Sequence, residues 1–190
     1  MLRRVCWYVC NALLFDSWLV PTSAPKRWLL RRFGARIESG VVIKPRVNIK
    51  YPWRLSIGAD TWVGEGVWID NLAAVEISHD VCISQGARLL TGNHDYRDPA
   101  FGLIVGPIKI ESCAWVGAFA TICPGVTLAN SCVVTVGSVV TQSTEAECVY
   151  AGSPATVRRR RYASASRVES SAASSAATDG EIAARYARTS

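Results

Sequence analysis

The sequence predicts an all-β fold, a parallel β-helix of about five triangular coils, because short aliphatic repeats recur along most of the chain. From residue 110 the chain divides into units of six residues, and each unit begins with Ile, Val or Leu and has a small or β-branched fifth residue. The same spacing recurs upstream in three groups of three units, so the aliphatic first positions are Ile37, Ile43, Ile49, Ile57, Val63, Ile69, Ile77, Ile83, Leu89, Ile110, Val116, Ile122, Leu128, Val134 and Val140. A period of six matches neither a helical turn nor the alternation of a half-buried strand, and it indicates a triangle of three short strands and three corners.

Composition agrees with one soluble globular domain in a reducing compartment. The chain has 190 residues, of which 49% are hydrophobic and are dispersed in short runs. Its seven cysteines are an odd number without a CxxC pair, which favours the cytoplasm and argues against a disulfide framework or a zinc ribbon. We interpret the cysteines of the repeat region as packing residues and expect no cysteine nucleophile; they are Cys82, Cys113, Cys123 and Cys132.

The repeat pattern also divides the chain into segments. Residues 37–145 form the predicted β-helix, and residues 146–162 form a C-terminal wrap. For residues 1–36 we predict a basic amphipathic helical segment, which either packs on the domain or rests on a membrane surface. Residues 163–190 are rich in Ala and Ser, without a core-forming pattern, and we expect them to be disordered. The net charge of +6 comes largely from arginine clusters near both ends and favours a ligand phosphate or a membrane surface over nucleic acid.

The interruptions of the repeat predict where a functional site lies. Each group of three units ends in a longer gap, and the next aliphatic residue follows after eight, eight and twenty-one residues. If three units make one coil, all three gaps lie at the same corner of the prism, in coils stacked about 4.8 Å apart. We therefore expect Tyr51, Asn71 and an excursion loop at residues 94–107 to line one edge. Long loops on a regular scaffold commonly carry function.

Five segments resemble the WcaF-type acetyltransferases of colanic acid and related exopolysaccharide biosynthesis. These segments are "PRVNIKYPWRLSIG", "VGEGVWIDNL", "CISQGARLLTGNHDYRDPAFG", "AWVGAFATICPGV" and "VYAGSPA", and the resemblance runs from about residue 20 to 162. It implies a left-handed β-helix, acetyl-CoA as co-substrate and no metal. It also implies a homotrimer with active sites between subunits, and a saccharide or saccharide-lipid acceptor.

The resemblance assigns His94 as the general base, because the histidine of the "GNHD" segment has that role in this group. Imidazole is suited to removing the proton of a sugar hydroxyl at neutral pH, so direct transfer needs no covalent enzyme intermediate. We expect Asp70, Asn71 and Asn93 to orient the acceptor or the imidazole, and Tyr96 to lie in the acceptor site. The alternative is that His94 is a solvated loop residue.

Other polar residues near these positions have simpler interpretations. His79 occupies an outward-facing repeat position and is interpreted as structural. Asp95 and Asp98 either orient His94 or form a turn before Pro99.

The predicted coenzyme contacts follow from the same resemblance. Three tryptophans fall at sixth positions of repeats, where side chains point outward, and these are Trp62, Trp68 and Trp115. The segment that contacts the pantetheine arm corresponds to Trp115, Gly117 and Ala118, and a segment farther along corresponds to Val136, Gly137 and Thr141. Arg158 and Arg159 are expected to meet the coenzyme phosphates, although Thr156 departs from the basic residue that relatives often carry there.

The sequence leaves other functions open as alternatives. An N-acetylating or serine-type acyltransferase shares the predicted fold, as does a scaffold protein without catalytic activity. A metalloprotein of the γ-carbonic anhydrase type needs three histidine ligands, whereas this sequence contains two histidines.

Overall fold

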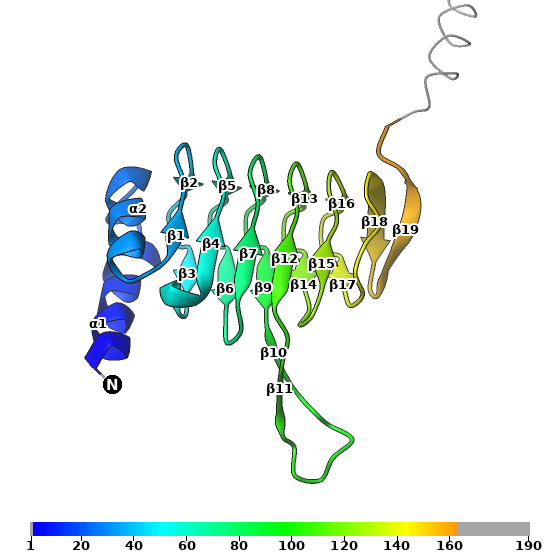
Figure 1. The fold of residues 1–190 in the computed structure, drawn as a ribbon, viewed down its shortest axis with the longest axis horizontal. Coiled ribbons are helices and arrows are strands. Elements are labelled where there is room, and N and C mark those ends of the chain that lie inside the picture. The colour runs from blue at the N-terminus through cyan, green and yellow to red at the C-terminus, as the bar shows by residue number, and fades with distance from the viewer. Residues whose placement is uncertain (1, 163–190) are drawn as a thin grey trace, which may run out of the picture.

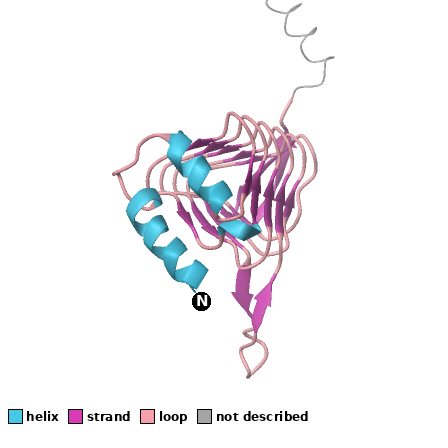
Figure 2. Ribbon diagram, turned by 60° about the vertical axis from the view of Figure 1, so that its left-hand side comes forward, coloured by secondary structure: helices cyan, strands magenta, loops and turns pink. Residues whose placement is uncertain are grey.

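The computed structural model describes residues 2–162, which form a triangular β-helix with helices across one end (Figure 1, Figure 2). Fifteen of its strands make five complete coils, and a further strand begins a sixth. The predicted fold class is therefore confirmed. The tail for which we expect disorder, residues 163–190, lies outside the described residues.

Three parallel sheets form the three faces of the prism, and each successive strand of a coil belongs to the next face. The first face holds β1 (Arg36–Ile37), β4 (Leu55–Ile57), β7 (Val75–Ile77), β12 (Ile108–Ile110) and β15 (Thr127–Leu128). The second holds β2 (Val42–Ile43), β5 (Trp62–Val63), β8 (Cys82–Ile83), β13 (Trp115–Val116), β16 (Val133–Val134) and β18 (Cys148–Gly152), with β19 (Ala155–Arg160) antiparallel at its edge. The third holds β3 (Asn48–Ile49), β6 (Trp68–Asp70), β9 (Arg88–Leu90), β14 (Thr121–Ile122) and β17 (Val139–Val140).

The aliphatic first positions of the repeats fill the interior. All fifteen are at most 6% exposed. The register stacks like positions on one another, so that Ile37 pairs with Ile57 and Ile57 pairs with Ile77. Burying each such side chain contributes about 1.5–3 kcal/mol, which is why the period of six selects this fold.

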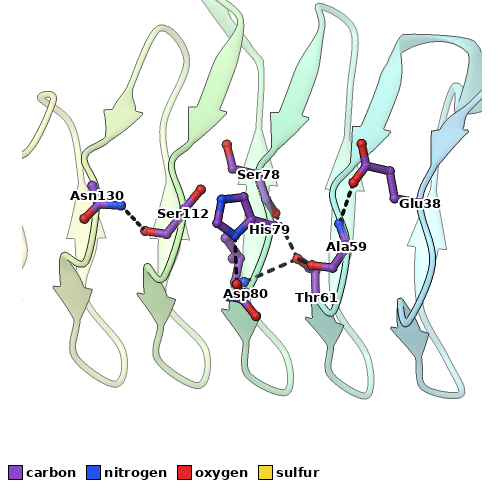
Figure 3. A network of polar contacts seen from close by, with 9 residues as sticks. Glu38, Ala59, Thr61, Ser78, His79, Asp80, Ser112 and Asn130 are labelled. Atoms are coloured by element: carbon purple, nitrogen blue, oxygen red, sulfur yellow. Dashed lines mark hydrogen bonds and ion pairs between the residues drawn. The ribbon is translucent and has the colours of Figure 1, made fainter.

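Three corners connect these faces. The first corner joins the first face to the second, the second corner joins the second face to the third, and the third corner joins the third face to the first. The first corner is closed by bonds between successive coils (Figure 3). There Glu38 accepts a hydrogen bond from the Ala59 amide at 2.9 Å, and the Asn130 side chain donates to the Ser112 carbonyl at 3.0 Å. These bonds satisfy main-chain groups where the strands stop.

The three interruptions of the repeat all lie at the third corner, as the spacing predicts. They separate β3 from β4, β6 from β7, and β9 from β12. The first contains a short 3₁₀ helix, Pro52–Arg54. The last extends outward as an antiparallel arm of β10 (Gly92–His94) and β11 (Leu103–Val105), which projects from the prism (Figure 1).

Helices cover the N-terminal end of the prism. They are α1 (Leu2–Cys10), the π-helical turn η1 (Asn11–Phe15) and α2 (Ser23–Arg32). Trp7 is buried and its indole NH donates to the Ile49 carbonyl at 2.7 Å, and the buried Lys26 donates to the Lys44 carbonyl at 2.9 Å. The helices thus cover the open edge of the first coil, where strands lack a neighbour. Within residues 2–162, no helix has the length and apolar character needed to cross a bilayer.

Candidate active site

The arm at the third corner carries the predicted base. His94 is the last residue of β10 and lies opposite Leu103 of β11. Its side chain is exposed, and the arm also exposes Leu103, Ile104 and Val105. A two-stranded arm is marginally stable in water alone, so an apolar exposed arm is typical of a segment that packs against another surface.

The imidazole of His94 is held in one orientation. Its Nδ1 lies 2.9 Å from the Phe101 carbonyl oxygen, and its ring stacks on the Phe101 ring with 4.4 Å between centroids and 4° between planes. A carbonyl oxygen can only accept, so Nδ1 must carry the hydrogen of the neutral ring. The Nε2 atom is therefore left with a lone pair, which is the form that a general base needs.

The role of Phe101 was not predicted from the sequence, which suggested Asp70, Asn71 and Asn93 as orienting residues. The Asn93 side chain accepts from the main-chain NH of His94 at 2.9 Å, whereas the Phe101 carbonyl orients the ring. Phe101 has a positive φ of 48°, which turns the chain back toward β10. The feature of the sequence that could have identified this residue is an aromatic side chain in a polar loop, directly before Gly102.

Asp95 and Asp98 have the turn role. The Asp95 carboxylate accepts from the Arg97 amide at 3.1 Å, and that of Asp98 accepts from the Ala100 amide at 2.9 Å. These bonds shape the tip of the arm. Tyr96, at the same tip, is exposed with the Arg97 guanidinium over its ring.

The structure corrects the prediction for Asn71. Its side chain is fully buried, accepts from the Tyr51 amide at 2.8 Å and donates to the Tyr51 carbonyl at 2.6 Å. An amide with both polar atoms engaged and no exposed surface cannot reach an acceptor or the exposed imidazole of His94. The predicted common edge is confirmed by this contact, but Asn71 ties two coils together there.

Asp70 instead lines a cleft of about 490 Å³ between α1 and the third corner. Its carboxylate forms an ion pair with Lys50 at 2.8 Å, and it is mostly shielded from solvent. Aromatic side chains make much of the wall. The lining residues are Arg4, Val5, Trp7, Tyr8, Asn11, Asn48, Ile49, Lys50, Tyr51, Trp68 and Asp70.

Most of the predicted coenzyme contacts gather near the second corner. Trp115 is exposed on the second face, and its indole NH donates to the Ser84 hydroxyl at 2.9 Å. The Gly137 amide donates to the Ala118 carbonyl at 2.8 Å, so these two turns stack directly. Gly117 packs against the next turn, where a Cβ would lie 2.7 Å from the Val136 nitrogen.

The remaining coenzyme candidates lie elsewhere. Thr141 follows β17 and so begins the third corner, apart from the other turns. Arg158 and Arg159 belong to β19 at the C-terminal end of the prism, where both are exposed. The structure therefore places the candidates at two corners and one end of a single chain.

The second histidine lies at another corner than the arm, and several cysteines of the repeat region are partly or fully buried. His79 is at the first corner and forms an ion pair with its neighbour Asp80 at 2.7 Å (Figure 3). Burial raises the pKa of the Cys82, Cys123 and Cys132 thiols, which lowers their reactivity as nucleophiles. Within residues 2–162, no three His, Cys, Asp or Glu side chains lie close enough together to hold a metal ion.

Comparison with known proteins identifies a relative whose sequence aligns with most of this chain. WcaF of Escherichia coli, named as a colanic acid biosynthesis acetyltransferase, is 38% identical over 158 residues, which cover 82% of this chain and 85% of WcaF. The chain belongs to the WcaF family of acetyltransferases. Nodulation protein L of Rhizobium leguminosarum is 36% identical over 60% of this chain and 66% of its own. No protein-family model matches the sequence.

Solved structures of other acetyltransferases share the fold of this chain. A hexapeptide-repeat acetyltransferase from Vibrio cholerae matches with a TM-score of 0.75 and 26% identity, covering 85% of this chain and 92% of its own. Galactoside acetyltransferase in complex with coenzyme A matches with a TM-score of 0.75 and 23% identity, covering 84% and 81%. Membership of this family makes the protein an acyltransferase, as the sequence predicts.

Proposed function

We propose that the protein is an O-acetyltransferase that transfers the acetyl group of acetyl-CoA to a sugar hydroxyl, with His94 as general base. The observation that carries this proposal is the bond between His94 Nδ1 and the Phe101 carbonyl, because it leaves Nε2 as the proton acceptor. The complexes of related folds with acetyl-CoA and coenzyme A support the donor. The name of the WcaF relative supports a saccharide acceptor in exopolysaccharide synthesis.

The chemistry follows from that orientation. Nε2 of His94 takes the proton of the acceptor hydroxyl while the hydroxyl oxygen attacks the acetyl carbonyl carbon. When the carbon–sulfur bond breaks, the imidazolium returns the proton to the sulfur of coenzyme A. The products are the acetyl ester and the free thiol, and His94 is again neutral.

The cleft that Asp70 lines is the proposed acceptor site. Its aromatic walls suit the apolar faces of a sugar ring, and the Asp70 and Lys50 side chains offer an acceptor and donors for hydroxyl groups. Within the described residues, no side chain of the arm lines this cleft. Most coenzyme candidates lie at the second corner, whereas the arm leaves the third.

This separation supports a homotrimer with active sites between subunits. Strands and corners of one coil side span roughly 15–20 Å, so one chain holds the base and most of the coenzyme candidates well apart. Packing of the apolar arm against a neighbouring subunit would bring the base to the coenzyme candidates of that subunit and bury the exposed strands. We propose that the reaction takes place in the cytoplasm.

Replacement of His94 tests the base. We expect H94A to lower kcat by a factor of about 10²–10⁴, measured as release of the coenzyme A thiol with acetyl-CoA and a panel of saccharides. H79A is the matched control, because His79 is also exposed but lies at another corner, and its turnover should match the wild type. Unchanged turnover of H94A would refute the assignment of the base. If the wild type acetylated none of the saccharides in the panel, the proposed acceptor class would be wrong.

A further inference from the structure

The outward side of the N-terminal helices is an apolar surface with no partner among the described residues. The buried side of α1 and η1 carries Trp7, Asn11 and Phe15, at intervals of four residues. A second stripe is exposed, and it consists of Leu2, Cys6, Val9 and Leu13. A surface helix normally carries polar residues on its outer side, so this helix departs from the rule.

Neighbouring residues extend this surface. Trp18 and Leu19, which follow η1, are exposed. Trp28 is exposed on α2, and the next turn of that helix exposes Arg32. The Arg31 guanidinium instead donates to the Ile37 and Glu38 carbonyls of the first coil. Both helices lie across the end of the prism, so their outer sides face away from the coils (Figure 2). We call these residues the N-terminal face: Leu2, Cys6, Val9, Leu13, Trp18, Leu19, Trp28 and Arg32.

The segment that carries this face has a net positive charge. Residues 1–36 hold seven Arg and Lys residues and one acidic residue, Asp16, a net charge of +6. The whole chain has the same net charge of +6, so the rest of the sequence balances to zero. A positive end would attract an anionic surface and orient this face toward it.

We propose that the N-terminal face binds the surface of an anionic lipid bilayer. Aliphatic side chains, exposed tryptophans and arginines in one surface are the combination that interfacial membrane segments use, with apolar groups in the headgroup region and cations near lipid phosphates. The helices do not span the bilayer and bind in its plane. A second copy of the chain would bury the apolar stripe equally well, but it would repel the net charge of +6 with an identical charge.

Docking would also bring the proposed acceptor cleft near the membrane, because α1 carries the N-terminal face on one side and borders the cleft on the other. Trp7 and Tyr8 of α1 line that cleft. A saccharide attached to a lipid would then enter the cleft from the bilayer. This consequence rests on the proposed function, whereas the docking itself does not.

Sedimentation with vesicles tests the proposal without any measurement of activity. The full chain is mixed with vesicles of phosphatidylcholine alone or with added phosphatidylglycerol, and bound protein is measured after centrifugation. We expect binding to the anionic vesicles that weakens as salt increases. No binding of the wild type to the anionic vesicles would overturn the proposal.

Two pairs of variants make the test specific to this face. Val9 and Val157 are 49% and 51% exposed, at opposite ends of the prism. V9Q should bind anionic vesicles about tenfold more weakly than the wild type, whereas V157Q should bind as the wild type does. R32Q should bind about fivefold more weakly at low salt, and R88Q, on the third face, should not.

Several results would contradict the docking surface. Equal binding by V9Q and V157Q would show that the face is not the contact. If light scattering showed that V9Q loses oligomers that V157Q retains, and the wild type bound no vesicles, the face would be an interface between copies. Acetyl transfer to a soluble acceptor should be unchanged in V9Q, so failure of docking is distinct from failure of the proposed function.

Discussion

Substitution of Asn71 by Ala distinguishes a structural residue from a substrate-binding one. In the structure, the Asn71 side chain makes two hydrogen bonds to the main chain of Tyr51, at 2.8 and 2.6 Å, from a fully buried position. Each bond contributes about 1 kcal/mol net, and the two Tyr51 groups left without a partner add to the cost. We expect N71A to lose about 3 kcal/mol of stability, which corresponds to a fall in thermal midpoint of roughly 6–12 °C.

Thermal unfolding of the full chain, followed by circular dichroism, measures this loss. N93A is the matched control, because the Asn93 side chain is exposed and bonds only to the amide of His94, its neighbour. Its midpoint should stay within about 2 °C of the wild type. Acceptor KM is measured at a temperature where N71A remains folded. An N71A variant with an unchanged midpoint and a raised acceptor KM would refute this reasoning and restore the substrate-binding role.

Two further predictions concern packing and thiol reactivity. G117A should lower the thermal midpoint by several degrees, because its Cβ would lie 2.6 Å from the Val134 carbonyl oxygen, whereas G102A, with open space around it, should not. Alkylation by iodoacetamide, followed by mass spectrometry at pH 8, should modify the exposed Cys113 well before Cys132, because burial raises the pKa of the Cys132 thiol and lowers its thiolate fraction. Equal rates at the two thiols would contradict the burial.

Much of the fold was predictable because the repeat is a property of local sequence. Each coil needs an aliphatic residue at a fixed interval, so the burial of Ile43 and Val63 can be predicted from their spacing alone. The gaps in the spacing likewise fix the corner from which the arm leaves. In the C-terminal segment, residues 146–162, the structure adds the antiparallel pairing of β18 and β19, which no repeat pattern indicates.

The site was predictable in part. Sequence alone determined that His94 lies in an excursion from the coil edge and that Trp115 points outward from the prism. Only the tertiary structure decided that the Phe101 carbonyl orients the imidazole and that Asn71 is buried against Tyr51. Periodicity reports which side of the backbone a residue occupies, whereas a hydrogen bond depends on the partner that folding brings within 3 Å. That partner lies seven residues away for His94 and twenty for Asn71, where no pattern of spacing identifies it.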